Sequence, residues 1–342
     1  MICKLKIDTH SVSLHDERMG IAVVTTRNED KNLCTEASKV LSLEGVSIGD
    51  AEELTAYLAK DPNSIILWDL DHPEATVPTH PISIQRVSTV LKKHAKLERV
   101  LGISDNELTT MPYLANVRIF DHHLFRRELA GSSYLIARLL ESILIGIPAG
   151  IERFFQEGVK VQKLALESSA QRKTLVEAVN KTLEKTSLPS RLNILISQYT
   201  DELLMNAIFD APRKDGVFYK KNSDRTSDFV LDPLETVALE FAVGQEYLSV
   251  CVRDQFGSMT KEAFMKSVWK NFVRDSYKPA QGTPAAGLGI YGILQSGLSL
   301  SYICEPGVCT EAYLFAPTVK NIKAMRKSFR FWSAVYSGKN DV

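Results

Sequence analysis

A glutamate and an asparagine lie four residues apart in a stretch whose apolar pattern predicts a helix. Glu202 and Asn206 are separated only by Leu203, Leu204 and Met205. Residues four apart project from one face of a helix, so the two side chains are expected to point the same way. An Asn carbonyl oxygen suits Mg²⁺, which keeps several waters and takes phosphate oxygens as further ligands. A Glu one turn away can orient or deprotonate an attacking water or hydroxyl, so the pair predicts chemistry at a terminal phosphate.

Two further segments carry residue types that suit a nucleotide. Asp254 ends an apolar run and is followed by a glycine turn at Gly257. An ionised carboxylate only accepts hydrogen bonds, which suits the exocyclic amine of adenine. Gly287 and Gly289 open an apolar helical segment. Glycines let the backbone approach phosphates closely, and the first amides of a helix are free to bind them.

In this order the three segments resemble the N, G1 and G2 boxes of the Bergerat-fold ATPases. That superfamily includes DNA gyrase, mismatch-repair ATPases, histidine kinases and anti-sigma factor serine kinases. The resemblance covers about residues 157–318 and implies ATP or ADP with Mg²⁺, Glu202 as the catalytic base and Asn206 as the metal ligand. The nucleotide contacts that it implies are Asn206, Asp254, Gly257, Met259, Gly287, Leu288, Gly289 and Thr310.

The elements around these boxes favour one branch of the superfamily. A strand is expected over residues 159–166 and a helix over 170–179, followed by a Leu188-Pro189 connection into the Glu202 helix. This order resembles anti-sigma factor serine kinases more than histidine kinases. It implies ATP-dependent regulation of a protein partner, by nucleotide-controlled binding, by serine/threonine phosphorylation, or by both.

Departures from the boxes keep a non-catalytic nucleotide sensor open as an alternative. Phe256 stands where the G1 box of histidine kinases has a Gly, and Ala285-Ala286 replace the leading Gly of the G2 box. After the Asn-Ala pair, the chain has Ile208-Phe209-Asp210 where many kinases have Lys or Arg. These changes leave adenine recognition and the metal position intact, but they argue against efficient phosphoryl transfer.

The preceding part of the chain predicts a different arrangement. Strands are expected over residues 20–24, 45–48, 64–68, 99–103 and 117–120, with helices over 50–60 and 84–95 between them. Five such β/α units predict a doubly wound parallel sheet. The predicted fold class is therefore α/β with two domains, a receiver-like (flavodoxin-like) parallel sheet over 19–128 and a Bergerat-type α/β sandwich over 157–319.

Asp69 ends the third of these strands and resembles the phosphoacceptor of response-regulator receiver domains. Receivers also carry an acidic pair after the first strand, where this chain has Thr25-Thr26, and a Lys after the fifth, where it has Asp121-His122-His123. Too few carboxylates remain for a divalent ion. The resemblance therefore implies a pseudo-receiver, with Asp69 as a vestigial phosphoacceptor. A histidine-kinase-like enzyme with His122 or His123 as phosphoacceptor is a further alternative, although these lie at a strand end rather than on a long helical hairpin.

Two segments flank the predicted ATP-binding domain. Residues 129–156 predict a helical connector, whose apolar residues at helical spacing would pack on the first sheet or against a second copy in a homodimer. Residues 320–342 form a basic tail, and its stretch from Lys320 to Arg330 is expected to be a solvated helix packed by its aromatic residues, with contact to a membrane or nucleic acid as the alternative.

Composition narrows the classes of partner and compartment. Lys plus Arg and Asp plus Glu both number 41, so the net charge indicates neither nucleic acid nor a membrane surface. The absence of a long apolar run predicts no membrane span, and residues 1–19 are too polar for a signal peptide. The five scattered cysteines show neither disulfide nor metal spacing, which fits a cytoplasmic location.

Overall fold

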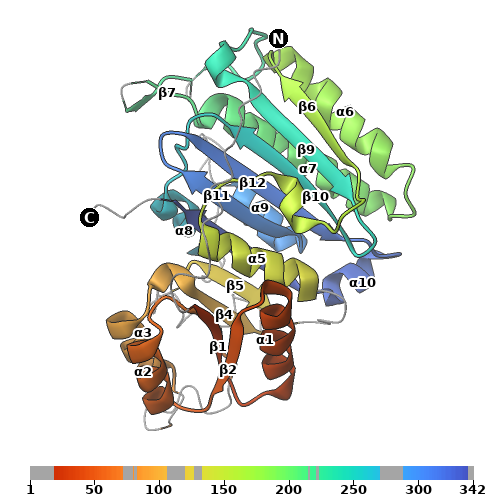
Figure 1. Cartoon of the computed structure of the whole chain (residues 1–342). Coiled ribbons are helices and arrows are strands. Elements are labelled where there is room, and N and C mark those ends of the chain that lie inside the picture. Colours follow the sequence, from red (N-terminus) through yellow and green to blue (C-terminus); the bar gives the residue numbers. More distant parts are fainter. Residues whose placement is uncertain are drawn as a thin grey trace.

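The computed structural model describes residues 19–71, 80, 83–105, 120–126, 133–214, 216–220, 223–269 and 288–337. Its first part contains five parallel strands and the helices between them (Figure 1). The strands are β1 (Gly20–Val24), β2 (Glu44–Ile48), β3 (Ile65–Asp69), β4 (Val100–Ser104) and β5 (His122–Phe125). The helices are α1 (Asn28–Leu41), α2 (Ala51–Lys60), α3 (Ile84–His94) and α5 (Ser133–Ile145).

Four of the five strands predicted in this part are confirmed to within one residue. Every residue of β1, β3 and β4 is buried, as expected for parallel strands covered on both faces. The fifth strand was placed incorrectly at 117–120. Residues 117–119 lie outside the described residues, Phe120 is not in a strand, and β5 begins at His122. The shift matters because it changes which residue follows the strand.

The second part of the chain is mainly antiparallel. Its strands are β6 (Val161–Leu166), β9 (Val237–Val243), β10 (Tyr247–Asp254), β11 (Ser299–Glu305) and β12 (Cys309–Pro317), with a small hairpin of β7 (Arg213–Lys214) and β8 (Val217–Phe218). Its helices are α6 (Arg172–Leu183), α7 (Ser190–Met205), the π-helix η5 (Asn206–Asp210), α8 (Lys261–Trp269), α9 (Leu288–Ser296) and α10 (Ile322–Lys327). The predicted strand at 159–166, the helix at 170–179 and the Glu202 helix are all present.

A last strand, β13 (Arg330–Tyr336), joins the two parts. It pairs antiparallel with β5 and parallel with β11, which gives one sheet of order β2-β1-β3-β4-β5-β13-β11-β12-β10-β9-β6. The helix expected over residues 320–330 is present only as α10, at Ile322–Lys327, and the strand that follows it was not predicted. The physical reason is that Phe331, Trp332, Ala334 and Val335 are all buried, so both faces of the strand are covered.

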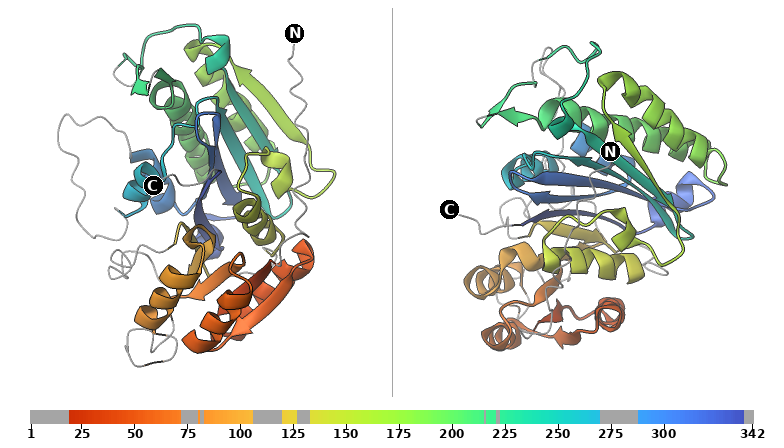
Figure 2. Two further views of the ribbon diagram at one scale, coloured as in Figure 1. Left: turned by 60° about the vertical axis from the view of Figure 1, so that its left-hand side comes forward. Right: turned by 45° about the horizontal axis from the view of Figure 1, so that its top comes forward.

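Helices cover both faces of this sheet, as the two views of Figure 2 show. One core contains residues of α2, α3, α6, α7, α8 and α9, and the other contains residues of α1 and α5. Alternate residues of each central strand enter opposite cores, as the two-residue period of a strand requires. The α/β class is confirmed. Both cores contain residues from both parts of the chain, so the division into two domains stays a prediction.

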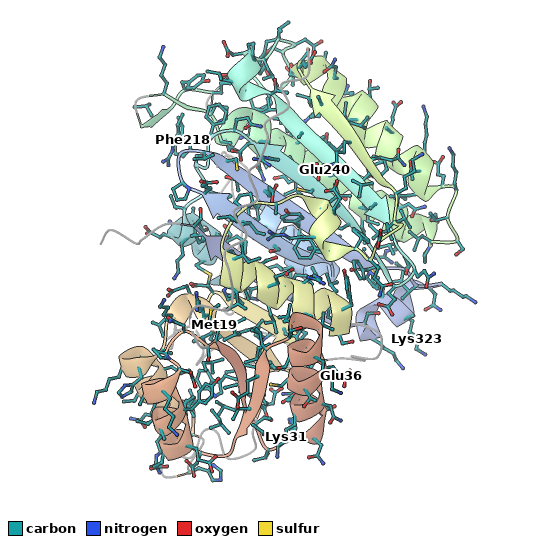
Figure 3. All side chains as sticks on the ribbon, in the orientation of Figure 1. Met19, Lys31, Glu36, Phe218, Glu240 and Lys323 are labelled. Atoms are coloured by element: carbon teal, nitrogen blue, oxygen red, sulfur yellow. The ribbon has the colours of Figure 1, made fainter. Side chains whose placement is uncertain are left out.

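Two carboxylates, of which Glu311 is fully buried, anchor the connector to the sheet. Its helix, α5, packs against α1, and the following residues form only a short 3₁₀ turn, η3 (Ile151–Phe154). Glu311 of β12 accepts hydrogen bonds from the amides of Ala149 and Gly150, both at 3.0 Å. Glu240 of β9, labelled in Figure 3, accepts from the amide of Ile151 at 3.1 Å. These bonds fix the connector against the antiparallel part.

Candidate functional site

A cavity of about 500 Å³ lies between the α7–η5 helix, α8, α9 and the strands β10, β11 and β12. Five of the residues predicted to bind nucleotide line it, although they come from distant parts of the chain: Asn206, Asp254, Met259, Gly289 and Thr310. Gly287 lies outside the described residues, and Leu288 begins α9 without a described side chain. The structure thus brings all three sequence segments to one cavity.

Asp254 ends β10 and provides the cavity with a buried carboxylate. Its Oδ1 accepts hydrogen bonds from the amides of Phe256 at 2.8 Å and Gly257 at 3.1 Å, which close the turn after the strand. Burial raises the pKa of Asp254 to about 6, against the opposing effect of these amides and of Thr310. The carboxylate is therefore ionised at neutral pH but close enough to its pKa to respond to mild acid.

Gly257 has a structural role in this turn and does not itself line the cavity. Its φ of 55° lies in the left-handed region, where glycine is favoured. A Cβ on Gly257 would lie 2.0 Å from the carbonyl oxygen of Glu305. Only glycine lets the turn after β10 approach the β11–β12 hairpin this closely.

Asn206 lies where the α-helix α7 changes into the π-helix η5. The amide of Ala211 donates to the carbonyl of Asn206 at 2.9 Å, a bond across five residues instead of four. Such π-turns are uncommon and occur often at functional sites. Leu203, Asn206, Ala207, Asp210 and Ala211 all line the cavity, so this single face of the widened helix forms one wall.

Glu202 lies beside the cavity rather than among its lining residues. It is half-buried, and its side chain packs against Gly289 of α9. Burial raises the pKa of Glu202; Arg225 opposes the shift, and Asp210 and Asp201 add to it. A raised pKa brings a carboxylate closer to the range that suits a general base.

Sequence reasoning missed three charged residues and one tyrosine of the cavity: Asp210, Arg213, Lys266 and Tyr302. Asp210 is ion-paired with Arg225 at 2.8 Å, and the Arg213 guanidinium lies 4.0 Å from the ring centre of Phe218, which Figure 3 labels on the β7–β8 hairpin. Asp210 was detectable, because it follows Asn206 by four residues. The other three lie on elements whose sequence gives no chemical pattern.

A second group of buried charges gathers at the carboxyl ends of the parallel strands. Arg126 directly follows β5, is 4 % exposed and contacts four carboxylates. Its Nε and Nη2 donate to Asp30 at 2.6 and 2.9 Å, and Nη2 also donates to Asp69 at 2.7 Å. Its Nη1 lies 3.0 Å from Asp105 and 3.5 Å from Asp71. The expectation that no cation follows the fifth strand is thus incorrect, because that strand begins later than predicted.

Both oxygens of Asp69 have partners. Oδ1 accepts from Arg126, while Oδ2 accepts from the Thr25 hydroxyl at 3.1 Å and lies 3.5 Å from Arg27 Nε. The predicted phosphoacceptor is buried and fully engaged in this network. Thr25, which stands where receivers have an acid, lies between Asp69 and Asp30, and its single hydroxyl proton is shared with Asp30 Oδ2 at 2.9 Å.

The two histidines proposed as alternative phosphoacceptors are buried inside β5. Burial lowers the pKa of His122 to about 4 and that of His123 to about 3, so both are neutral. His122 pairs with Ser333 at 2.7 Å and with the carbonyl of Glu98 at 2.9 Å, and His123 pairs with Ser104 at 2.9 Å. Neither ring is accessible to a phosphodonor in this arrangement.

No protein-family model matches the chain, and no curated protein is significantly similar to it in sequence. Within the described ranges, no helix is both long and apolar enough to cross a membrane. The same residues contain no group of three or more His, Cys, Asp or Glu side chains arranged to hold a metal ion. Any metal in the cavity would therefore need other oxygen ligands, such as an amide or a phosphate.

Proposed function

We propose that the chain binds ATP or ADP with Mg²⁺ in this cavity, as a Bergerat-type cytoplasmic signalling protein that regulates a protein partner. One observation carries the proposal. Asn206, Asp254, Gly289 and Thr310, which were selected by sequence pattern from four separate elements, line one cavity. Four unrelated polar or glycine positions would not be expected to converge in this way by chance.

The cavity has the size and lining that a nucleotide requires. Its volume of about 500 Å³ lies within the range of roughly 300–1,000 Å³ common for small-molecule sites. Val252, Ile290 and Ala312 supply apolar surface for a purine ring, and Asp254 supplies the acceptor for its amine. Arg213 and Lys266 supply positive charge for phosphates.

The residues present also fit a magnesium ion. Asn206 and Asp210 both line the cavity from the η5 helix and would hold the ion through one amide oxygen and one carboxylate oxygen. Mg²⁺ is commonly bound by one or two protein oxygens together with waters and phosphates. When bound, the ion neutralises charge on the phosphates.

If the protein is a serine/threonine kinase, Glu202 would take a proton from a hydroxyl group of the partner. Its position on α7 and its raised pKa support this role. A specific observation favours the second candidate, a non-catalytic nucleotide sensor. The Glu202 carboxylate packs against Gly289 instead of lining the cavity, so it would have to move to meet a bound ligand.

We propose that the parallel part is a pseudo-receiver that presents a docking surface. The order β2-β1-β3-β4-β5 is that of flavodoxin-like sheets. We infer that Asp69 is not phosphorylated because its two oxygens accept hydrogen bonds from Arg126 and Thr25. Asp69 is buried, and one of its oxygens would have to leave these partners before it could attack a phosphodonor.

Calorimetric titration with a non-hydrolysable ATP analogue and Mg²⁺ tests the nucleotide site. Asp254→Asn should weaken binding by about 1.5–3 kcal/mol, the range for hydrogen bonds to a charged group. Glu311→Gln is the control, because Glu311 is also buried but contacts the connector and does not line the cavity. Absent binding by the parent chain, or equal affinity of the parent and Asp254→Asn, would refute the proposal.

A further inference from the structure

Helix α8 has two faces with different surroundings. Ala263 and Lys266 are exposed and line the cavity. Phe264 and Val268 are fully buried. Residues three or four apart lie on one side of a helix, so the two pairs project from different sides of α8. The helix is therefore a wall of the cavity whose position depends on the contacts of its buried face.

The buried face of α8 packs on β13, the strand that joins the two parts of the sheet (Figure 1). Phe264 contacts Trp332 of β13, with ring centres 6.3 Å apart. Trp332 in turn stacks on Phe120 and His123 of the parallel part, with ring centres 6.1 and 5.9 Å apart. Trp332 is fully buried, and in a closely packed interior one such ring cannot shift without its neighbours. The parallel part thus reaches the cavity wall through packed rings.

An ion pair also ties the first residue of α8 to the parallel part. Lys261 Nζ contacts Oδ2 of Asp121, which directly precedes β5. The Asp121 side chain is 9 % exposed, and its carbonyl accepts a hydrogen bond from the amide of Ala334 at 3.0 Å. The Lys261 side chain is 42 % exposed. Asp121 is therefore the fixed member of the pair, and Lys261 is the member that it holds.

We propose that Asp121 is a positioning residue of the nucleotide site, which holds α8 in place through Lys261. The inference rests on the proposed function, in which Lys266 of α8 supplies charge to the phosphates, and adds to it a regulation by the parallel part. Val252, Asp254 and Ala312, which are proposed to contact the purine, lie on β10 and β12 instead. Loosening α8 should therefore weaken the contact with the phosphates and leave the purine site in place.

Coupling of this kind acts in both directions. A change at the start of β5 that weakens the pair of Asp121 and Lys261 would lower the nucleotide affinity. Bound nucleotide would stabilise the same pair by an equal free energy. The pseudo-receiver would in this way set the affinity of the cavity without phosphorylation of Asp69.

Asp121→Ala removes the buried carboxylate and leaves Lys261 to be solvated. Titration with Mg²⁺ and a non-hydrolysable ATP analogue should show a loss of affinity of about 2- to 30-fold, the range for residues coupled to a site that they do not contact. Glu240→Ala is the matched control. Glu240 of β9 pairs with the half-exposed Lys163 at 3.0 Å and does not line the cavity. This variant should bind like the parent.

Adenosine gives a readout that a general loss of structure would not produce. It has no phosphates, so Asp121→Ala should bind it as tightly as the parent does. A distortion spread through the sheet would instead weaken adenosine and the ATP analogue alike. Equal losses for the two ligands would overturn the positioning role.

A double-mutant cycle tests whether Asp121 acts through Lys261. Lys261→Met removes the charge and should weaken binding of the ATP analogue like Asp121→Ala. The double variant should bind no more weakly than either single one, because each already breaks the pair. Additive losses would contradict the pairing. If the parent binds and Asp121→Ala binds equally well, this inference fails while the proposed function stands, whereas a parent that binds no adenine nucleotide would end both.

Discussion

Gly289 and Glu202 are packed so closely that no side chain fits between them. A Cβ on Gly289 would lie 2.5 Å from Cγ and 2.6 Å from Oε1 of Glu202. Gly289 was selected as a phosphate-binding glycine, but its contact with the glutamate is a second reason for the absence of a side chain. The conformation of the proposed base therefore depends on α9.

We expect Gly289→Ala to displace Glu202 and lower ATP turnover by tenfold or more, since misplacing a catalytic group by about 1 Å can cost up to roughly 100-fold. The measurement is steady-state phosphate release. Gly292→Ala is the control on the same helix, because a Cβ there would meet the Tyr199 hydroxyl at 3.0 Å instead of Glu202. Equal rates for the two variants would show that the contact does not position the base.

Glu202→Gln keeps the size of the side chain and removes its basicity. ATP affinity should stay within a few-fold of the parent, whereas turnover should disappear, since a base acts mainly in the transition state. Affinity by calorimetry and turnover by phosphate release check the two halves of this prediction. Unchanged turnover would rule out Glu202 as the base. A parent chain that binds ATP without turnover would instead support the sensor.

The raised pKa of Asp254 predicts a pH dependence of binding. The ionised carboxylate is a stronger acceptor for the adenine amine than the protonated carboxyl, so adenosine affinity should fall as the pH drops through about 6. Adenosine is preferable to ATP because it has no phosphates that titrate. His122 and His123, with pKa values of about 4 and 3, stay neutral over this range. Asp254→Asn should abolish the pH dependence, and a profile that persists in this variant would assign it to another group.

The stability of the ligand-free protein should depend on pH in the opposite sense to the adenosine affinity, so that it increases as the pH falls. A carboxyl whose pKa rises from 3.8 in the unfolded chain to about 6 on folding binds its proton more tightly in the folded state. Its contribution is fully present below pH 3.8 and is lost as the pH rises through about 6. We expect the free energy of unfolding of the parent to fall relative to that of Asp254→Asn as the pH rises across this window. Urea denaturation measures both.

Arg126→Ala should destabilise the protein by about 3–5 kcal/mol, because it leaves the buried carboxylates around it uncompensated. Lys39→Ala is the surface control. It breaks an exposed pair with Glu36 at 2.8 Å, and such pairs contribute only about 0–1 kcal/mol. Urea denaturation measures both. Similar losses for the two variants would contradict the structural role assigned to Arg126.

Aspartyl phosphorylation should not occur in the parent chain. Incubation with acetyl phosphate and Mg²⁺ should leave the intact mass unchanged, since the oxygens of Asp69 already bind Arg126 and Thr25. A phosphodonor also cannot shift a conformational equilibrium without different affinity for the two states. A stoichiometric mass gain that disappears in Asp69→Ala would restore a working receiver.

The sequence was most informative where periodicity and chemistry coincided. Asn206, Asp254 and Thr310 were selected because their residue types and positions resemble those of the Bergerat ATPases, and the structure brings them to one cavity. Arg126 was missed because an apolar run at 117–120 was taken for the fifth strand. Tyr302 was missed because a tyrosine in an alternating strand is indistinguishable from a core residue until its neighbours are known. The π-turn at η5 has no recognisable pattern in one sequence.

The position of β13 has a consequence for how the molecule folds. Ser333 of this strand pairs with His122, 211 residues earlier in the chain. Until it inserts, β5 and β11 each expose an unpaired edge, which is a site for aggregation. Contacts between residues so distant in sequence form slowly, because a long loop must be closed first. Insertion of β13 should therefore be a late step of folding. Until it occurs, we expect chaperones to bind mainly at these two edges.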